Sequence, residues 1–228
     1  MPQYKPWEKE FKKSKLITQH DKPQSDVLKF YRYLKKSEKI KLENLDVLDL
    51  GSGTGRNSNY LAGKNNRVVG MEISDTAIDT AKKRASKLGV EVKYLKHSIG
   101  EKYPFSKDSF DLVLDVFTSN SLTEKERDMY LLETNRILKK KGYFFVKALC
   151  KEGDKNAENL LKISPGQEKD SYFMKEMGLF ERIFAKEDFI ELYSKYFEIL
   201  MLEKKTSRIP FNNQIYKRNF WIAYLKNK

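Results

Sequence analysis

The chain has 228 residues, which is enough for one α/β domain with a sizeable core and slightly short for a two-domain dehydrogenase. Hydrophobic residues make up 39% and charged residues 34%, and no apolar run reaches membrane-spanning length, so we expect a hydrated globule rather than a membrane protein. The net charge of +13 invites a nucleic-acid partner. Because lysine outnumbers arginine and is scattered, a lysine-rich surface is the favoured interpretation and a nucleic-acid patch stays open.

The N-terminal residues resemble neither a secretory signal nor a transit peptide, since they lack an apolar stretch and carry acids among their lysines. Cys150 is the single cysteine, so an internal disulfide is excluded and a reducing compartment is indicated. We therefore expect a cytoplasmic protein. The two histidines and one cysteine are too few for a zinc site, and no metal is expected.

Two helices are predicted before the first strand, at Trp7–Lys15 and Ser25–Lys36. The second has a continuous apolar face, and either Ser25 or Asp26 is expected to cap it. The loop between the two helices holds His20.

From residue 46 the pattern alternates between strands and helices, which is typical of a parallel sheet covered on both faces. The predicted strands are Val47–Leu50, Arg67–Ile73, Glu91–Lys96, Phe110–Val116 and Tyr143–Leu149. One helix is predicted to start at Ser74 or Asp75 and to end before Gly89. Another starts at a capping box of Thr123 and Glu126 and reaches residue 138. Lys139 to Lys141 are expected at the end of this second helix.

The last third contains a predicted helix, Lys186–Tyr196, and two strands, Phe197–Lys204 and Asn219–Leu225. The stretch between the strands shows no helical period and contains Pro210, so a helical crossover is excluded and the strands should pair antiparallel. The predicted fold class is therefore α/β, a doubly wound, mostly parallel seven-stranded sheet that ends in an antiparallel hairpin, with helices on both faces.

Residues 46–62 read DVLDLGSGTGRNSNYLA, a strand followed by a turn with Gly51, Gly53 and Gly55 and by the start of a helix. Glycine suits a backbone that bends sharply against a ligand, and the helix then directs unpaired N–H groups at that ligand. A dinucleotide fingerprint needs a small residue where Arg56 stands, which argues against an NAD-dependent dehydrogenase and leaves it as a rival. The next strand ends near Glu72, whose carboxylate is placed to accept both hydroxyls of a ribose.

The segments VLDLGSGTG and VVGMEIS, followed by PFSKDSFDLVLD and RILKKKGYFFVKA, resemble the class I S-adenosylmethionine-dependent methyltransferases over residues 45–150. The resemblance implies S-adenosyl-L-methionine as cofactor. It assigns Asp49 to the methionine ammonium, directly or through water, Glu72 to the ribose and Ile73 to the adenine face. The remaining implied contacts are those of the turn, Gly51, Ser52, Gly53 and Gly55, and those at the adenine edge, Ser98 and Ile99. The structural alternatives are that Asp49 caps local backbone groups and that Glu72 is a solvated strand end.

The acceptor is expected at the carboxyl end of the fourth strand, where the family places the reacting methyl group. Asp115 and Asn120 lie there, and Asp115 is also counted among the cofactor contacts. Asp115 either orients or deprotonates the acceptor or satisfies loop N–H groups, and the two interpretations are equally supported. His20 is a candidate general base on a loop at the cofactor side.

The predicted organisation has an N-terminal helical segment, 1–44, that covers the cofactor, and a methyltransferase domain, 45–228. Within it, residues 151–185 are an insertion on the substrate side, which either shapes an acceptor pocket or packs on the body of the domain. The expected acceptor is a small polar or heteroaromatic molecule. The alternatives are an RNA, DNA or protein methyltransferase that uses the basic surface, and a non-catalytic cofactor-binding protein.

Overall fold

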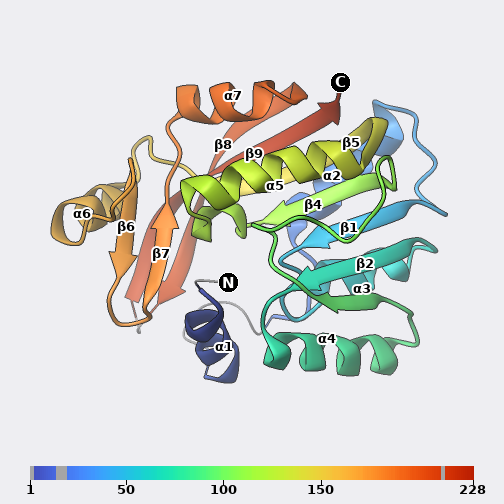
Figure 1. Cartoon of the computed structure of the whole chain (residues 1–228), viewed down its shortest axis with the longest axis horizontal. Helices are drawn as coiled ribbons and strands as arrows, with labels where there is room; N and C mark the ends of the chain where they lie inside the picture. Colours follow the sequence, from blue (N-terminus) through green and yellow to red (C-terminus); the bar gives the residue numbers. More distant parts are fainter. Residues whose placement is uncertain (1–2, 14–19, 212–213) are drawn as a thin grey trace.

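A computed structural model describes residues 3–13, 20–211 and 214–228 of the chain. Its main element is a seven-stranded sheet with the order β3-β2-β1-β4-β5-β9-β8 (Figure 1). Strands β1 to β5 run parallel, whereas β9 pairs antiparallel with β5 and β8 antiparallel with β9. The strands are β1 Asp46–Leu50, β2 Arg67–Glu72, β3 Lys93–Lys96, β4 Phe110–Val116, β5 Leu138–Leu149, β8 Phe197–Phe211 and β9 Gln214–Asn227. This architecture confirms the predicted fold class.

Helices cover both faces of the sheet (Figure 1). One face carries α2 and α3, and the other carries α5 and α7, each through its own apolar cluster. The remaining helices lie at the edges, α4 beside β2 and β3, and α1 against α4. Their bounds are α1 Tyr4–Lys12, α2 Ser25–Lys36, α3 Arg56–Ala62, α4 Asp75–Leu88, α5 Glu124–Ile137, α6 Lys155–Ile163 and α7 Lys186–Ser194, and a short 3₁₀ turn, Ser119–Ser121, follows β4.

Strand β5 shows how the sequence builds the two layers. Phe144 and Val146 belong to the cluster under α5 and α7, whereas Tyr143 and Phe145 belong to the cluster under α2. Successive side chains of a strand point to opposite faces, so a strand covered on both sides must be apolar at every position. Lys147, the one charged side chain between residues 142 and 149, is nevertheless only 5% exposed.

Several predicted helix ends are confirmed. Ser74 caps α4 by accepting a hydrogen bond from the N–H of Ala77, and Gly89 ends that helix in the left-handed conformation. The capping box of Thr123 and Glu126 is present at α5. Helix α2 differs from the prediction, because Gln24 precedes it and makes no side-chain cap, while Asp26 pairs with lysines instead.

The prediction for the first helix, Trp7–Lys15, is wrong at its start, since α1 begins at Tyr4, and part of its predicted end lies outside the described residues. The run Lys139 to Lys141 was also misplaced. Helix α5 ends at Ile137 and β5 starts at the next residue, so Lys139 is a strand residue that bridges Asp46 at 3.0 Å and Asp111 at 2.9 Å.

The last two strands are much longer than predicted. β8 and β9 continue through the stretch expected to be a connector, with a register that extends to Phe211 and Gln214. Pro210 is tolerated because β8 is the edge strand of the sheet, where a missing N–H need not remove a ladder hydrogen bond. The antiparallel pairing itself is confirmed.

Residues 151–185 contain regular structure that the sequence analysis did not predict. Helix α6 begins at Asp154, whose side chain accepts a hydrogen bond from the N–H of Ala157. A two-stranded antiparallel sheet follows, formed by β6 Ser171–Met174 and β7 Leu179–Arg182. The charged residues of this segment obscured the alternation of these two short strands.

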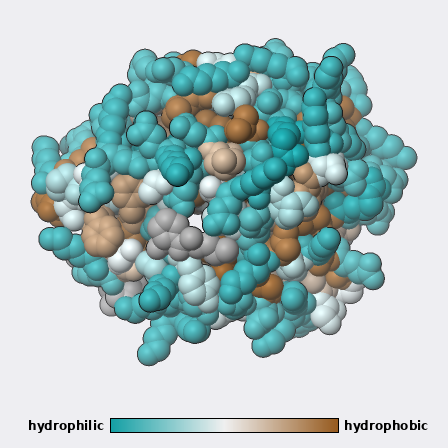
Figure 2. Space-filling model, viewed as in Figure 1, coloured by the Kyte–Doolittle hydropathy of each residue, from teal (hydrophilic) through white to brown (hydrophobic). Residues whose placement is uncertain are grey.

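Most of the surface seen in Figure 2 is hydrophilic, with apolar side chains showing between the polar ones. Among the described residues, no helix is both long and apolar enough to cross a membrane.

Candidate functional site

The glycine turn joins β1 to α3 and cannot be built from other residues. Gly51, Gly53 and Gly55 all have positive φ, at 64°, 53° and 79°. A Cβ added at Gly51 would lie 2.2 Å from the side chain of Thr118 on the neighbouring strand end. A side chain at this position would therefore be both conformationally strained and in collision, which explains the glycine.

Glu72 holds the turn from the end of β2. Its carboxylate accepts hydrogen bonds from the N–H groups of Gly53 at 2.9 Å, Ile73 at 2.8 Å and Ser74 at 2.9 Å. Burial raises the pKa of this carboxyl group, and the three N–H donors oppose that effect because they favour the charged form. The residue chosen for a ribose contact is thus fixed against the turn rather than a solvated strand end.

Asp49 lies beneath the turn and is withdrawn from the ligand space. Its side chain is 1% exposed, and Oδ2 accepts a hydrogen bond from the Ser58 hydroxyl at 2.6 Å. Burial raises the pKa of Asp49 to about 6, while Ser58 and Arg56 act in the opposite direction. Asp49 does not line the cavity, and its role toward the methionine ammonium, directly or through water, stays a prediction.

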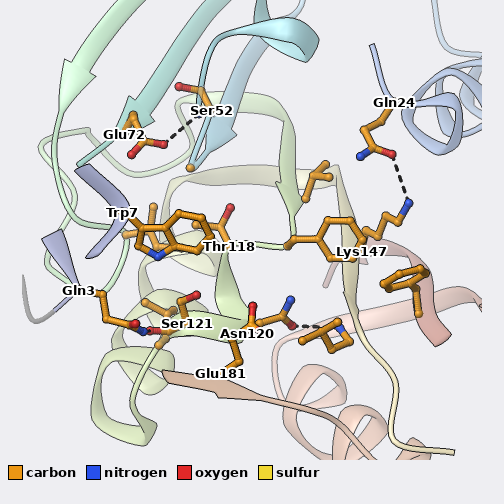
Figure 3. A pocket seen from close by; sticks show the side chains of 18 of the residues that line it. Gln3, Trp7, Gln24, Ser52, Glu72, Thr118, Asn120, Ser121, Lys147 and Glu181 are labelled. Atoms are coloured by element: carbon orange, nitrogen blue, oxygen red, sulfur yellow. Dashed lines mark hydrogen bonds between the residues drawn. The ribbon is translucent and has the colours of Figure 1, made fainter. Parts of the chain in front are cut away.

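A cavity of about 560 Å³ opens above the turn, within the size range of small-molecule sites. Its walls come from the carboxyl ends of β1, β2, β4 and β5, from α1, from the hairpin β6/β7 and from β8 and β9. Figure 3 shows Glu72 and Ser52 on one side of the cavity and Asn120, Ser121 and Glu181 on the opposite side. This is the sheet edge at which the sequence placed the ligands.

Most of the predicted cofactor residues lie on this wall, namely Gly51, Ser52, Gly53, Glu72, Ile73, Ser98 and Ile99. Ser98 accepts a hydrogen bond from the N–H of Gly100 at 3.2 Å, so its hydroxyl is engaged within its own loop. Gly55 is a correction, because it does not line the cavity. A Cβ there would lie 2.3 Å from the Tyr94 hydroxyl, so this glycine serves the packing of α3 against β3.

Asp115 is hydrogen-bonded to the loop after β4. Its side chain is fully buried and absent from the cavity wall. The carboxylate accepts hydrogen bonds from the N–H of Thr118 at 2.8 Å and from the Tyr130 hydroxyl at 2.7 Å, with longer contacts to the Ser119 N–H. Of the two interpretations of Asp115, these contacts favour the structural one, and its catalytic and cofactor roles stay predictions.

His20 lies away from the cavity wall. It is exposed, it does not line the cavity, and its backbone carbonyl accepts a hydrogen bond from Arg84 at 3.0 Å. A general base must come within hydrogen-bond reach of the acceptor, so this position does not favour His20, whose role stays a prediction. Asn120, in contrast, lines the cavity as predicted.

The sequence analysis missed three N-terminal residues that line the cavity, namely Gln3, which precedes α1, and Trp7 and Phe11 of α1. The helix is attached to the start of α4. Glu8 accepts hydrogen bonds from the Ser74 and Thr76 hydroxyls, each at 2.6 Å, at the start of α4. Interleaved aromatic residues in a lysine-rich helix were the only signal available for this role.

A second missed group lies on the wall below the start of α2. Lys147 donates to Asp26 Oδ2 at 2.8 Å and to Gln24 Oε1 at 3.2 Å, and all three residues line the cavity (Figure 3). A lone lysine within the apolar run GYFFVKALC was a readable signal. Its partner stands 121 positions earlier in the chain, so the pairing itself was not readable.

Three buried polar atoms on the cavity wall have no hydrogen-bond partner among the described residues, Ser52 Oγ, Asn120 Nδ2 and Ser121 Oγ. Buried polar groups are normally paired, and a cluster of unpaired ones around a cavity indicates that a bound ligand supplies the partners. Ser52 belongs to the glycine turn, so the turn and its surroundings fit a nucleoside-type cofactor. The other two lie on the side of the acceptor.

Comparison with known proteins agrees with this geometry. A family model described as a methyltransferase domain matches residues 47–142. A ubiquinone biosynthesis O-methyltransferase of Bartonella quintana is 28% identical over 107 residues, 47% of this chain and 42% of that protein. A ribosomal protein L11 methyltransferase of Dictyoglomus turgidum is 32% identical over 125 residues, 50% of this chain and 36% of that protein. The chain thus spans less than half the length of these two relatives.

Solved structures share the fold over nearly the whole chain. A 1,6-didemethyltoxoflavin-N1-methyltransferase of Burkholderia thailandensis, with 1,6-didemethyltoxoflavin and S-adenosylhomocysteine bound, has a TM-score of 0.72 at 15% identity and covers 100% of this chain and 88% of its own. The PH0226 protein of Pyrococcus horikoshii has a TM-score of 0.70 at 21% identity, with coverages of 94% and 95%. Residues 47–142 thus match a methyltransferase domain, and these findings together support a class I S-adenosylmethionine-dependent methyltransferase with S-adenosyl-L-methionine as its cofactor.

Proposed function

We propose that this protein transfers the methyl group of S-adenosylmethionine to a small polar or heteroaromatic acceptor. The observation that carries the proposal is the continuous cavity, which joins the glycine turn and Glu72 to an enclosed region lined by Asn120, Lys147 and aromatic side chains. A site of this form holds a cofactor and a compact second molecule side by side.

The chain's own residues have distinct roles in this proposal. The backbone at Gly51 and Gly53 and the hydroxyl of Ser52 hold the methionine portion, and Glu72 accepts from the ribose hydroxyls. The adenine is bound between Ile73 and the loop of Ser98 and Ile99. Bound S-adenosylmethionine supplies an already activated methyl group, so the protein contributes alignment and the exclusion of water.

The enclosure supports a small acceptor over a macromolecule. Trp7 and Phe11 of α1 line the cavity on one side, and Leu160, Met174 and Glu181 of the segment 151–185 line it on another, which supports the proposed cover and insertion. The heteroaromatic compound named for the Burkholderia enzyme is consistent with this acceptor class. Binding to nucleic acid through the basic surface is the outcome that would redirect the proposal.

Calorimetry with S-adenosylhomocysteine, followed by incubation with methyl-labelled cofactor and fractionated cell extract, tests the function. We expect saturable binding and label in the small-molecule fraction, with neither in the Gly51→Ala variant. Absence of binding to the wild type would contradict the cofactor assignment. Label confined to RNA or protein would contradict the acceptor class, and binding without label in any fraction would indicate a non-catalytic protein.

A further inference from the structure

One wall of the cavity carries more positive than negative charge. Asp26 is 2% exposed, and its two carboxylate oxygens are each bonded to a different ammonium group, Oδ2 to Lys147 and Oδ1 to Lys205. Burial lowers the pKa of Lys147, and the like charges of Lys205 and Arg56, which both line the cavity, act in the same direction. Arg56 interacts electrostatically with the carboxylate of Asp49. The surplus therefore rests on the two ammonium groups that share Asp26.

The other charged groups of the inner wall do not show this surplus. Arg218 is paired with Asp154 at 2.9 Å, and its second nitrogen donates to the Tyr172 hydroxyl at 3.2 Å. Glu181 accepts from the same hydroxyl at 2.7 Å. A buried cation without full compensation is costly, so the surplus at Lys147 marks the place where a ligand anion is stabilising.

Two aromatic rings flank the Lys147 ammonium. The ring centroids of Phe117 and Phe220 lie 4.8 and 5.2 Å from Nζ and 4.9 Å from each other. Phe117 has a φ of 68°, a left-handed conformation that is strained for a residue with a bulky side chain. Strained backbone of this kind persists at sites that the surroundings over-determine, and here it brings a flat apolar surface beside a cation.

An unpaired donor faces the same region. Asn120 is 1% exposed and uses Oδ1 to accept from the N–H of Leu149 at 3.0 Å, which leaves Nδ2 without a partner among the described residues. Leu149 stands two positions after Lys147 on β5, so the side chains of Lys147 and Leu149 point to the same face of the strand. Figure 3 shows Asn120 and Lys147 bordering the same space.

We propose that Lys147 and Asn120 recognise one anionic oxygen of a flat acceptor, whose ring packs against Phe117 and Phe220, so that the substrate class is a small aromatic or heteroaromatic acid. The inference rests on the proposed function and narrows its acceptor. Lys147 supplies the charge, Asn120 Nδ2 supplies a directed hydrogen bond, and Asp26 with Gln24 keeps the ammonium in position.

The test uses the full-length protein saturated with S-adenosylhomocysteine and three matched probe pairs, benzoate and benzamide, nicotinate and nicotinamide, and indole-3-acetate and indole-3-acetamide. Affinities are measured by calorimetry and by ligand-observed NMR. In at least one pair we expect the acid to bind about tenfold more tightly than its amide, the size of one charge-assisted contact. Amides that bind as tightly as the acids in all three pairs would overturn the proposal.

Variants test whether Lys147 and Asn120 cause the preference for acids over amides. Lys147→Met should abolish it, and Asn120→Asp should abolish it while keeping the oxygen that accepts from Leu149. Lys139→Met is the matched control, since that lysine also bridges carboxylates but lies outside the cavity. Retained S-adenosylhomocysteine binding shows that each variant is folded, and a preference that survives both cavity variants contradicts the assignment.

The binding of S-adenosylhomocysteine distinguishes a failure of the proposed function from a failure of the acceptor inference. If S-adenosylhomocysteine does not bind the wild type, the proposed function fails. If it binds and the acids compete with it instead of binding beside it, the cation wall serves the carboxylate of the cofactor, and the acceptor inference alone is overturned.

Discussion

Replacing Gly51 by alanine tests whether the glycine turn is built for a close backbone approach. Gly89 offers a matched control, because both glycines have nearly the same φ, 64° and 66°. A Cβ at Gly89 meets nothing within 4 Å, whereas a Cβ at Gly51 lies 2.2 Å from two atoms of the Thr118 side chain and 2.7 Å from its Cβ.

The two variants share the conformational cost and differ in the collision. A left-handed conformation costs an alanine about 1 to 2 kcal/mol, which both variants bear. Rotation of Thr118 does not relieve the contact at its Cβ, so the loop after β4 must move in Gly51→Ala. Overpacking of this kind costs a further 1 to 3 kcal/mol, roughly, and it displaces the cavity wall that Thr118 forms.

Thermal unfolding and calorimetry with S-adenosylhomocysteine distinguish these effects. For a chain of this size 1 kcal/mol shifts the midpoint by about 2 to 4 °C, so we expect a shift of a few degrees in Gly89→Ala with normal binding. Gly51→Ala should shift further and lose at least about tenfold in affinity, which corresponds to 1.4 kcal/mol. Equal affinities in the two variants would refute the reasoning.

Three further predictions follow from the same region. Glu72→Ala leaves three N–H groups without their partner, one buried and two partly buried, so we expect the variant to lose about 3 kcal/mol in urea unfolding and to bind the cofactor more weakly. Glu72→Gln should lose less, and equal midpoints for the two variants would contradict this. Folding raises the pKa of Asp49 from 3.8 to about 6, so as the pH rises from about 3 to about 7 the wild type should lose about 3 kcal/mol of stability that Asp49→Asn does not lose, and parallel pH profiles would argue against a buried carboxyl. Trp7→Ala should speed the release of S-adenosylhomocysteine about fivefold in stopped-flow measurements, because the variant loses about 1 kcal/mol of apolar contact with the ligand. Leu88 is exposed and lies outside the cavity, so Leu88→Ala should release the ligand at the wild-type rate.

The fold was largely readable because its strands are long, apolar and covered on both faces. Helix caps such as Ser74 and the box of Thr123 and Glu126 depend on neighbouring residues, and both were predicted correctly. The extension of β8 and β9 was not readable, because its polar, proline-containing sequence becomes a strand only through pairing with its partner.

The candidate site also has one part that could be predicted from the sequence and one part that could not. The glycine turn and Glu72 follow each other closely in the chain, so spacing alone placed them together. The structural contacts of Asp115 could not be predicted, because its position at a strand end says nothing about Tyr130, whose hydroxyl donates to it. Lys147 and Asp26 meet only through the tertiary fold, so their ion pair could not be predicted from the local sequence.

The hydrogen bonds that attach the N-terminal segment beside the cavity bear on the size of the acceptor. Gln3 donates to the backbone carbonyls of Phe180 on β7, at 3.0 Å, and of Ser121, and it accepts from the Phe180 N–H at 2.9 Å. One side chain thus ties the N-terminal segment to the acceptor hairpin and to the loop after β4, on the wall of the cavity. A polymer substrate would need these bonds broken throughout catalysis, whereas a small acid needs them broken only during exchange. The +13 charge therefore does not by itself argue for a nucleic-acid substrate, because Gln3 and α1 border the site that the charge would serve.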